Sequence, residues 1–130
     1  MILVDTHVVV WLAFEPQRLS KKGSSAIDEA RRSAEGLAVC DITLLELTAL
    51  ARKGRIGLEI SLESFLQEVE ERFVVLPITG RACVRATELP ASYPKDPADR
   101  VIGATALVEG LALVTADREI RRSKAVKTIW

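Results

Sequence analysis

Four acidic residues stand at positions of the sequence where metal-binding oxygens are commonly presented. Each follows an apolar run of strand length or falls in the first turns of a helix-length segment, and they are Asp5, Glu46, Asp99 and Asp117. Carboxylate oxygens are the ligands that Mg²⁺ and Mn²⁺ prefer in proteins. If the four side chains converge, the sequence predicts a cage for such an ion and cleavage of a phosphodiester bond by metal-activated water.

Three of these acids also have a purely structural interpretation as helix caps. Asp5 and Asp117 each precede a helix-length segment, where an Asp commonly bonds the free amides of the first turn. Thr43 and Glu46 have the spacing of a capping box, in which each side chain bonds the backbone amide of the other residue. Taken singly, each acid fits a cap as well as a metal ligand.

A proline-containing segment presents the remaining acid, Asp99. Asp96 fits the N-cap position ahead of Pro97, and this start places Asp99 in the first turn, where the helix dipole favours an anion. Asp96 therefore either supports the metal site or only caps the helix, and the cap is the favoured interpretation.

Apolar runs of strand length alternate with helix-length amphipathic segments. The runs carry Val, Ile or Phe and span residues 2–4, 37–40, 73–78, 111–115 and 126–129. Helical spacing of apolar residues marks residues 24–34, 43–52, 61–72, with Ser61 as the N-cap, and 97–109. This alternation predicts an α/β fold with a parallel sheet covered on both faces, and 130 residues suffice for one domain, residues 1–130.

Such a fold would bring the four acids together. In an open α/β sheet, the carboxyl ends of the strands and the amino ends of the following helices share one edge. Four caps at that edge would also be four carboxylates facing one crevice. Because carboxylates packed so closely repel one another, a divalent cation would be needed to offset their charge.

The charge and cysteine content restrict the class of protein. Lys and Arg total 18 and Asp and Glu total 18, so bulk charge gives no reason to bind nucleic acid or membrane. If four acids are held at a metal, 14 remain against 18 basic residues, which is compatible with an RNA substrate. Cys40 and Cys83 are isolated, which favours neither zinc nor disulfides. The apolar run Val8–Phe14 is far shorter than the roughly 18 to 20 residues of a membrane span. We expect a cytoplasmic protein without a membrane segment or signal peptide.

The four motifs together resemble those of the PIN-domain ribonucleases, in particular the VapC-type toxins of toxin–antitoxin pairs. The resemblance covers essentially the whole chain and rests on Ile2–Val8 around Asp5, on Glu46 in a Leu-rich helix, on Asp96–Ala106 and on Leu113–Asp117. It implies a three-layer α/β/α sandwich with a mainly parallel five-stranded sheet. It also implies Mg²⁺ or Mn²⁺ as cofactor, Asp5, Glu46, Asp99 and Asp117 as the catalytic metal ligands, and Thr6 and Thr115 as supporting residues.

The resemblance further implies an RNA substrate, a cognate antitoxin and a homodimer. Basic residues near the acids are expected to position the RNA backbone, although a solvated surface explains them equally well; they are Arg100, Arg118, Arg121, Arg122 and Lys124. Apolar residues beyond one sheet-facing stripe indicate interfaces on the first helix, around Val8, Val9, Trp11, Leu12 and Phe14, and on residues 44–50. Burial between neighbouring elements is the alternative. His7 is expected to be packed or hydrogen-bonded and not a general base.

The positions of the acids also bear on two other classes of protein. A receiver-type signalling domain needs paired acids after its first strand and an acid at the end of its central strand. Here the first strand ends in Asp5-Thr6, and residues 73–79 contain no acid. A non-catalytic RNA-binding module would not need all four acids, whereas a PIN-like nuclease of RNA maturation stays open.

Overall fold

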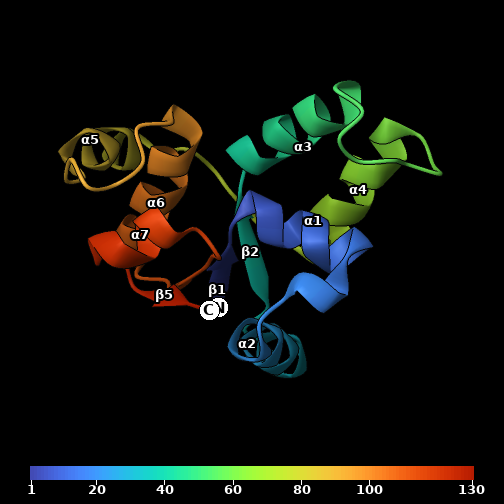
Figure 1. Ribbon diagram of the computed structural model, residues 1–130, viewed down its shortest axis with the longest axis horizontal. Helices are drawn as coiled ribbons and strands as arrows, with labels where there is room; N and C mark the ends of the chain where they lie inside the picture. The colour runs from blue at the N-terminus through green and yellow to red at the C-terminus, as the bar shows by residue number, and fades with distance from the viewer.

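The computed structural model describes residues 1–130 as a five-stranded sheet surrounded by helices (Figure 1). The strands are β1 (Ile2–Val4), β2 (Leu37–Cys40), β3 (Val74–Leu76), β4 (Leu113–Val114) and β5 (Thr128–Ile129). The helices are α1 (Thr6–Phe14), α2 (Lys21–Arg32), α3 (Ile42–Arg52), α4 (Leu62–Arg72), α5 (Gly80–Glu88), α6 (Pro97–Glu109) and α7 (Arg118–Ser123), with a 3-10 turn, η1, at Pro16–Arg18. The sheet order is β3-β2-β1-β4-β5 and every strand pair is parallel, which confirms the predicted fold.

Successive strand residues face opposite sides of the sheet and build two cores. Val4, Val39 and Val114 pack in one core with buried residues of α1, α2 and α4. Leu3 and Leu113 pack in the other with buried residues of α6 and α7. Because side chains alternate along a strand, both faces of the sheet are buried, and the strands therefore appear in the sequence as continuous apolar runs. The three layers of the predicted sandwich are present.

Element boundaries differ from the predicted ones where caps and proline decide. Strand β3 is shorter than residues 73–78 because Phe73 ends α4 and Pro77 has no N–H to donate. Helix α2 begins before residue 24 because the Ser20 hydroxyl accepts from the Gly23 amide at 3.0 Å and caps it. Helix α6 spans residues 97–109, as predicted. No helix of the fold has the length and apolar character needed to cross a bilayer.

Helix α5 is the element that the sequence pattern did not predict. Its first residue is Gly80, a residue type that disfavours helix interiors and commonly interrupts them. The missed signal was Thr79, whose hydroxyl accepts from the Ala82 amide at 3.1 Å as an N-cap. Ala82 and Ala86 form a small core with Ala104 of α6, so α5 covers the outer side of α6.

Candidate active site

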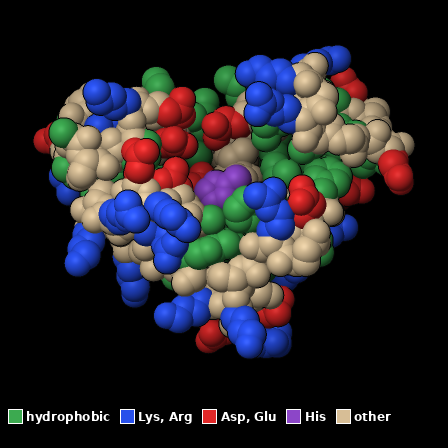
Figure 2. Space-filling view, viewed as in Figure 1, with side chains coloured by type: hydrophobic (Ala, Val, Ile, Leu, Met, Phe, Trp, Pro, Cys, Tyr) green, Lys and Arg blue, Asp and Glu red, His purple; other side chains and the backbone are tan.

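The four predicted acids lie together around one notch of the surface. Asp5 follows β1, Asp117 follows β4, Glu46 lies on α3 and Asp99 in the first turn of α6. Figure 2 shows acidic side chains along a notch between the α5–α7 side and the α3–α4 side of the molecule, with the single histidine, His7, at its base. The carboxyl edge of the parallel sheet thus places the acids, as in other open α/β sheets.

Asp5 is fixed by hydrogen bonds to both of its carboxylate oxygens. Its side chain is buried; Oδ1 accepts from the Thr6 amide at 2.9 Å and Oδ2 accepts from the Thr115 hydroxyl at 2.8 Å. The same Thr115 oxygen accepts from the Asp117 amide at 3.1 Å. One hydroxyl group therefore joins Asp5 to the turn that carries Asp117.

Glu46 is held by a pair of threonine hydroxyls. Its Oε1 accepts from the Thr6 hydroxyl at 2.6 Å, and the Thr6 oxygen lies 2.9 Å from the Thr43 oxygen. Because the Thr6 proton goes to Glu46, the Thr43 hydroxyl must donate to Thr6. The predicted capping box is wrong, since α3 begins at Ile42 with Asp41 at the N-cap and Thr43 is already inside the helix.

Asp96 and Asp117 both act as helix N-caps. The Asp96 carboxylate accepts from the Asp99 amide at 3.1 Å, which is the predicted cap of α6. Asp117 uses one oxygen, Oδ1, to accept from the amides of Glu119 and Ile120 at 2.8 and 3.1 Å. Its other oxygen is left for a ligand, so the cap and ligand interpretations of Asp117 are compatible.

Asp99 has a strongly raised pKa. Burial raises its pKa to about 7, and the neighbouring charges of Asp5, Asp96, Glu46 and Asp117 raise it in the same direction. Burial also raises the pKa of Glu46, against the hydrogen bond from Thr6. The Asp99 carboxylate itself accepts no hydrogen bond from the protein, so its lone pairs are free for another partner.

The donor set fits a hard divalent cation. All four candidate ligands offer carboxylate oxygen, which suits Mg²⁺ or Mn²⁺ better than zinc. Burial raises the pKa values of Asp99 and Glu46, and neighbouring carboxylates raise them further; a bound cation would offset both effects. No three of these side chains already surround one point as bound ligands do. The Asp99 carboxylate can change its rotamer without breaking a hydrogen bond, because it accepts none from the protein.

His7 links the two strand ends and does not act as a base. Its Nε2 accepts from the Ala116 amide at 3.0 Å, so the neutral ring carries its proton on Nδ1, which lies 3.7 Å from Asp5 Oδ2. The only lone pair of the neutral ring that could accept a proton is therefore occupied by the Ala116 amide. The prediction that His7 is a hydrogen-bonded residue is confirmed.

An aromatic cluster extends from His7 away from the acids. The His7 ring meets the edge of Trp11 with centroids 5.0 Å apart, and Trp11 meets Trp130 at 5.8 Å. The guanidinium of Arg18 lies 4.2 Å from the Trp11 ring centroid, within the range of a cation–π contact. The two tryptophans of the chain therefore pack against each other beside the site.

Arg100, which was predicted to lie on the RNA-binding rim, has its guanidinium engaged by backbone carbonyls. Its guanidinium donates to the carbonyls of Ala86 and Leu89, both at 3.2 Å, and to those of Pro90 and Tyr93 at 3.3 and 3.4 Å. Four carbonyl partners occupy the fork of donors that a phosphate would need. This contact could not be predicted from the residue pattern, because its acceptors are backbone atoms.

The basic residues after Asp117 are arranged differently. They line one surface hollow that contains no other side chain, and they are Arg118, Arg121, Arg122 and Lys124. None of them takes part in an ion pair, since the four ion pairs of the structure lie elsewhere. Their charge is therefore available to an anion next to the acids.

We expect the metal-free protein to lose stability as the pH rises from about 4 to about 7. The folded-state pKa of Asp99 is raised from 3.8 to about 7, so folding favours its protonated form; the stabilisation is complete below 3.8 and is lost as the pH passes 7. Denaturant unfolding in EDTA at several pH values measures this. Asp99→Asn should flatten the dependence, and an identical pH profile in wild type and variant would contradict it.

The comparisons with known proteins agree with the fold. The family model of the PIN domain matches residues 2–125. Ribonuclease VapC22 of Mycobacterium tuberculosis is 43% identical over 131 aligned positions, which cover 99% of this chain and 98% of the relative. Among solved structures, VapBC-1 from nontypeable Haemophilus influenzae has a TM-score of 0.74 at 17% identity and covers 98% of this chain and 96% of its own. A toxin-antitoxin complex from Klebsiella pneumoniae has a TM-score of 0.68 at 20% identity and covers 97% and 95%.

The chain belongs to the PIN domain family, whose model matches residues 2–125. Within that family, full-length identity of 43% groups it with the VapC-type ribonuclease toxins.

Proposed function

We propose that this chain hydrolyses RNA phosphodiester bonds at the acidic notch, with Asp5, Glu46, Asp99 and Asp117 as ligands of Mg²⁺ or Mn²⁺. The observation that carries the proposal is the clustering of carboxylates around Asp99, whose pKa is raised to about 7 mainly by burial and further by the charges of Asp5, Asp96, Glu46 and Asp117. When bound, such an ion activates water and offsets charge on the reacting phosphate. A nuclease of RNA maturation would use the same four acids and differs in its partners.

The residues of the chain divide the remaining work. Thr115 and Thr6 bond the carboxylates of Asp5 and Glu46 and so restrict the orientation of two of the proposed ligands. The hollow of Arg118, Arg121, Arg122 and Lys124 binds backbone phosphates, because its charges are exposed and unpaired. No side chain is needed as a nucleophile, which agrees with the engaged lone pair of His7.

Cleavage of single-stranded RNA by the purified chain tests the proposal. We expect cleavage with Mg²⁺ or Mn²⁺, none after EDTA, and recovery when the ion is restored, because the acids supply ligands and no alternative nucleophile. Gel analysis of a labelled RNA measures this. Equal cleavage with and without EDTA would contradict the proposed mechanism.

The antitoxin is proposed to bind the groove between α1 and α4. Leu12, Phe14, Ile60 and Phe65 contribute to its lining, and Phe14 and Ile60 are 40% and 44% exposed. Helix α1 presents fewer apolar side chains to solvent than its sequence suggested, because Val8 and Val9 lie in the core. Only the apolar residues of its outer half remain for an interface. An amphipathic segment of a partner could cover that half.

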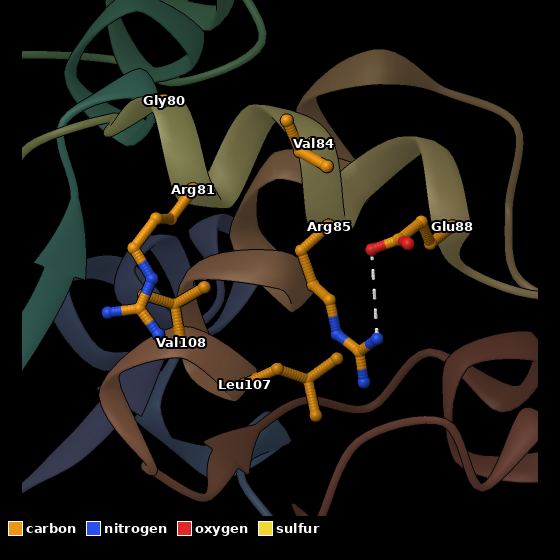
Figure 3. A pocket seen from close by; sticks show the side chains of 7 residues that line it. All are labelled: Gly80, Arg81, Val84, Arg85, Glu88, Leu107 and Val108. Carbon is orange, nitrogen blue, oxygen red and sulfur yellow. Dashed lines mark ion pairs between the residues drawn. The ribbon is translucent and has the colours of Figure 1, made fainter.

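A second copy of the chain is proposed to cover the hollow between α5 and α6. Figure 3 shows Val84, Leu107 and Val108 along this hollow, flanked by Arg81 and Arg85. Val84 is 63% exposed and lies in one apolar hollow with Leu107 and Val108, as expected of a surface that a partner covers. On the 44–50 segment, Leu45 is 64% exposed and offers a further apolar contact.

Light scattering and inhibition assays test both interfaces in one series. We expect a dimer for the wild type, a shift to monomer in Val84→Asp, and suppression of RNA cleavage by the product of the adjacent small gene. Phe14→Asp should weaken that suppression and leave cleavage intact, since an apolar contact is replaced by a charge. A monomeric wild type indifferent to the partner would contradict the toxin role while leaving the nuclease site standing.

A further inference from the structure

Tyr93 lies beneath the acids, in the loop between α5 and α6. Its side chain is 1% exposed, and its hydroxyl donates to the backbone carbonyl of Asp99 at 3.1 Å. Burial raises the pKa of the Tyr93 hydroxyl, and the charges of Asp5, Asp99 and Asp117 raise it further. The ring therefore stands within the electrostatic field of the notch, although it bonds none of the carboxylates.

Gly103 provides the space that the Tyr93 ring fills. A Cβ at Gly103 would stand 2.7 Å from Cζ of Tyr93 and closer still to its hydroxyl oxygen, so the ring or the helix would have to shift. Gly103 follows Asp99 by four residues, about one helical turn. The glycine thus lets the ring pack directly on the first two turns of α6.

Arg100 completes a closed set of contacts around the same loop. Its guanidinium, from the first turns of α6, donates to the carbonyls of Leu89, Pro90 and Tyr93. The Tyr93 hydroxyl returns to the carbonyl of Asp99, the residue that precedes Arg100. The loop and the start of α6 therefore hold each other through both side chains.

Asp99 depends on this arrangement more than the other acids do. Asp5, Glu46 and Asp117 each accept hydrogen bonds with their own carboxylates. The Asp99 carboxylate accepts none, and its residue follows no strand. Its position is consequently set by where the first turn of α6 is held.

We propose that Tyr93 and Arg100 are positioning residues for Asp99, holding the first turn of α6 so that the carboxylate can share an ion with Asp5. The inference rests on the proposed metal-dependent function and adds two residues that act through the backbone. Tyr93→Phe removes only the hydroxyl and keeps the ring against Gly103. Arg100→Lys keeps the charge and loses the planar fork that reaches several carbonyls.

The test is a calorimetric titration of the metal-free full-length chain with Mn²⁺. We expect the Kd for Mn²⁺ to rise roughly tenfold in each variant, the scale seen when groups behind metal ligands are removed. RNA cleavage should fall at low Mn²⁺ and recover at high Mn²⁺, with KM for RNA unchanged. Arg32→Lys, at an exposed position in the last turn of α2, is the matched control and should bind Mn²⁺ as the wild type does.

The outcomes separate this inference from the proposed function. Folded Tyr93→Phe and Arg100→Lys proteins with the wild-type Kd for Mn²⁺ would overturn it, even if their melting temperatures fell, because a purely structural role predicts that result. If the wild type binds no Mn²⁺ and Asp99→Asn leaves RNA cleavage unchanged, the proposed metal site and the positioning role are both overturned.

Discussion

Asp99→Asn is expected to lower metal-dependent RNA cleavage by at least about 100-fold, because changes to groups behind a metal ligand already cost 10- to 100-fold. The substitution should leave the fold intact and keep or raise the metal-free stability at neutral pH. The reason is that Asp99 carries a pKa of about 7 from burial and repulsion, and its carboxylate accepts no hydrogen bond. Kinetics with a labelled RNA and denaturant unfolding in EDTA measure the two effects.

Asp5→Asn makes an informative contrast. The same loss of activity is expected, but the two Asp5 oxygens accept from the Thr6 amide and the Thr115 hydroxyl, and an asparagine offers only one acceptor oxygen. Stability should therefore fall by about 1 to 3 kcal/mol. For the Asp99 variant described above, full cleavage at an unchanged melting temperature would show that Asp99 has no role in the mechanism.

Glu46→Gln is expected to lower cleavage by about 100-fold with little change in stability. The Gln carbonyl can still accept the 2.6 Å hydrogen bond from Thr6, so the contact between α1 and α3 survives while the negative charge is lost. Metal titration and RNA cleavage measure the effect. Because no capping box exists here and burial raises the pKa of Glu46, removal of its charge should keep or slightly raise the metal-free stability.

A glutamate on the exposed face of α4 provides the control for this substitution. Glu70→Gln removes an equal charge from a residue away from the notch and should leave metal binding and cleavage unchanged. Wild-type cleavage and metal affinity in Glu46→Gln would return Glu46 to a structural role.

The parts of the fold that burial determines were accessible from the sequence. Strands β1 and β2 and helix α6 have the predicted bounds, because a sheet buried on both faces needs continuous apolar runs and α6 begins at Pro97 after its cap. Helix α5 escaped prediction since its core face consists of alanines, which give a weak apolar signal. Strands β4 and β5 are shorter than their apolar runs, because in each run only two residues form hydrogen-bonded pairs with a neighbouring strand.

The four acids were predictable because each stands at a chain position that the sheet topology carries to one edge. What holds them was not. Thr43 looked like a cap because its spacing to Glu46 is that of a capping box, but its hydroxyl bonds Thr6, a residue 37 positions away. Arg100 looked like an RNA contact because of its neighbour in the sequence, whereas its partners are carbonyls across a loop. Contacts between distant side chains and backbone atoms leave no periodic trace in a sequence.

The packing of Trp11 against Trp130 gives the molecule an internal optical probe. These are the only two tryptophans of the chain, and Trp11 also touches His7, whose Nδ1 faces Asp5. All indole emission of the native protein therefore originates from one cluster connected to the acids through a single imidazole. Unlabelled protein can accordingly be followed by its intrinsic fluorescence while ions or nucleic acid are added, with no dye near the notch to disturb binding.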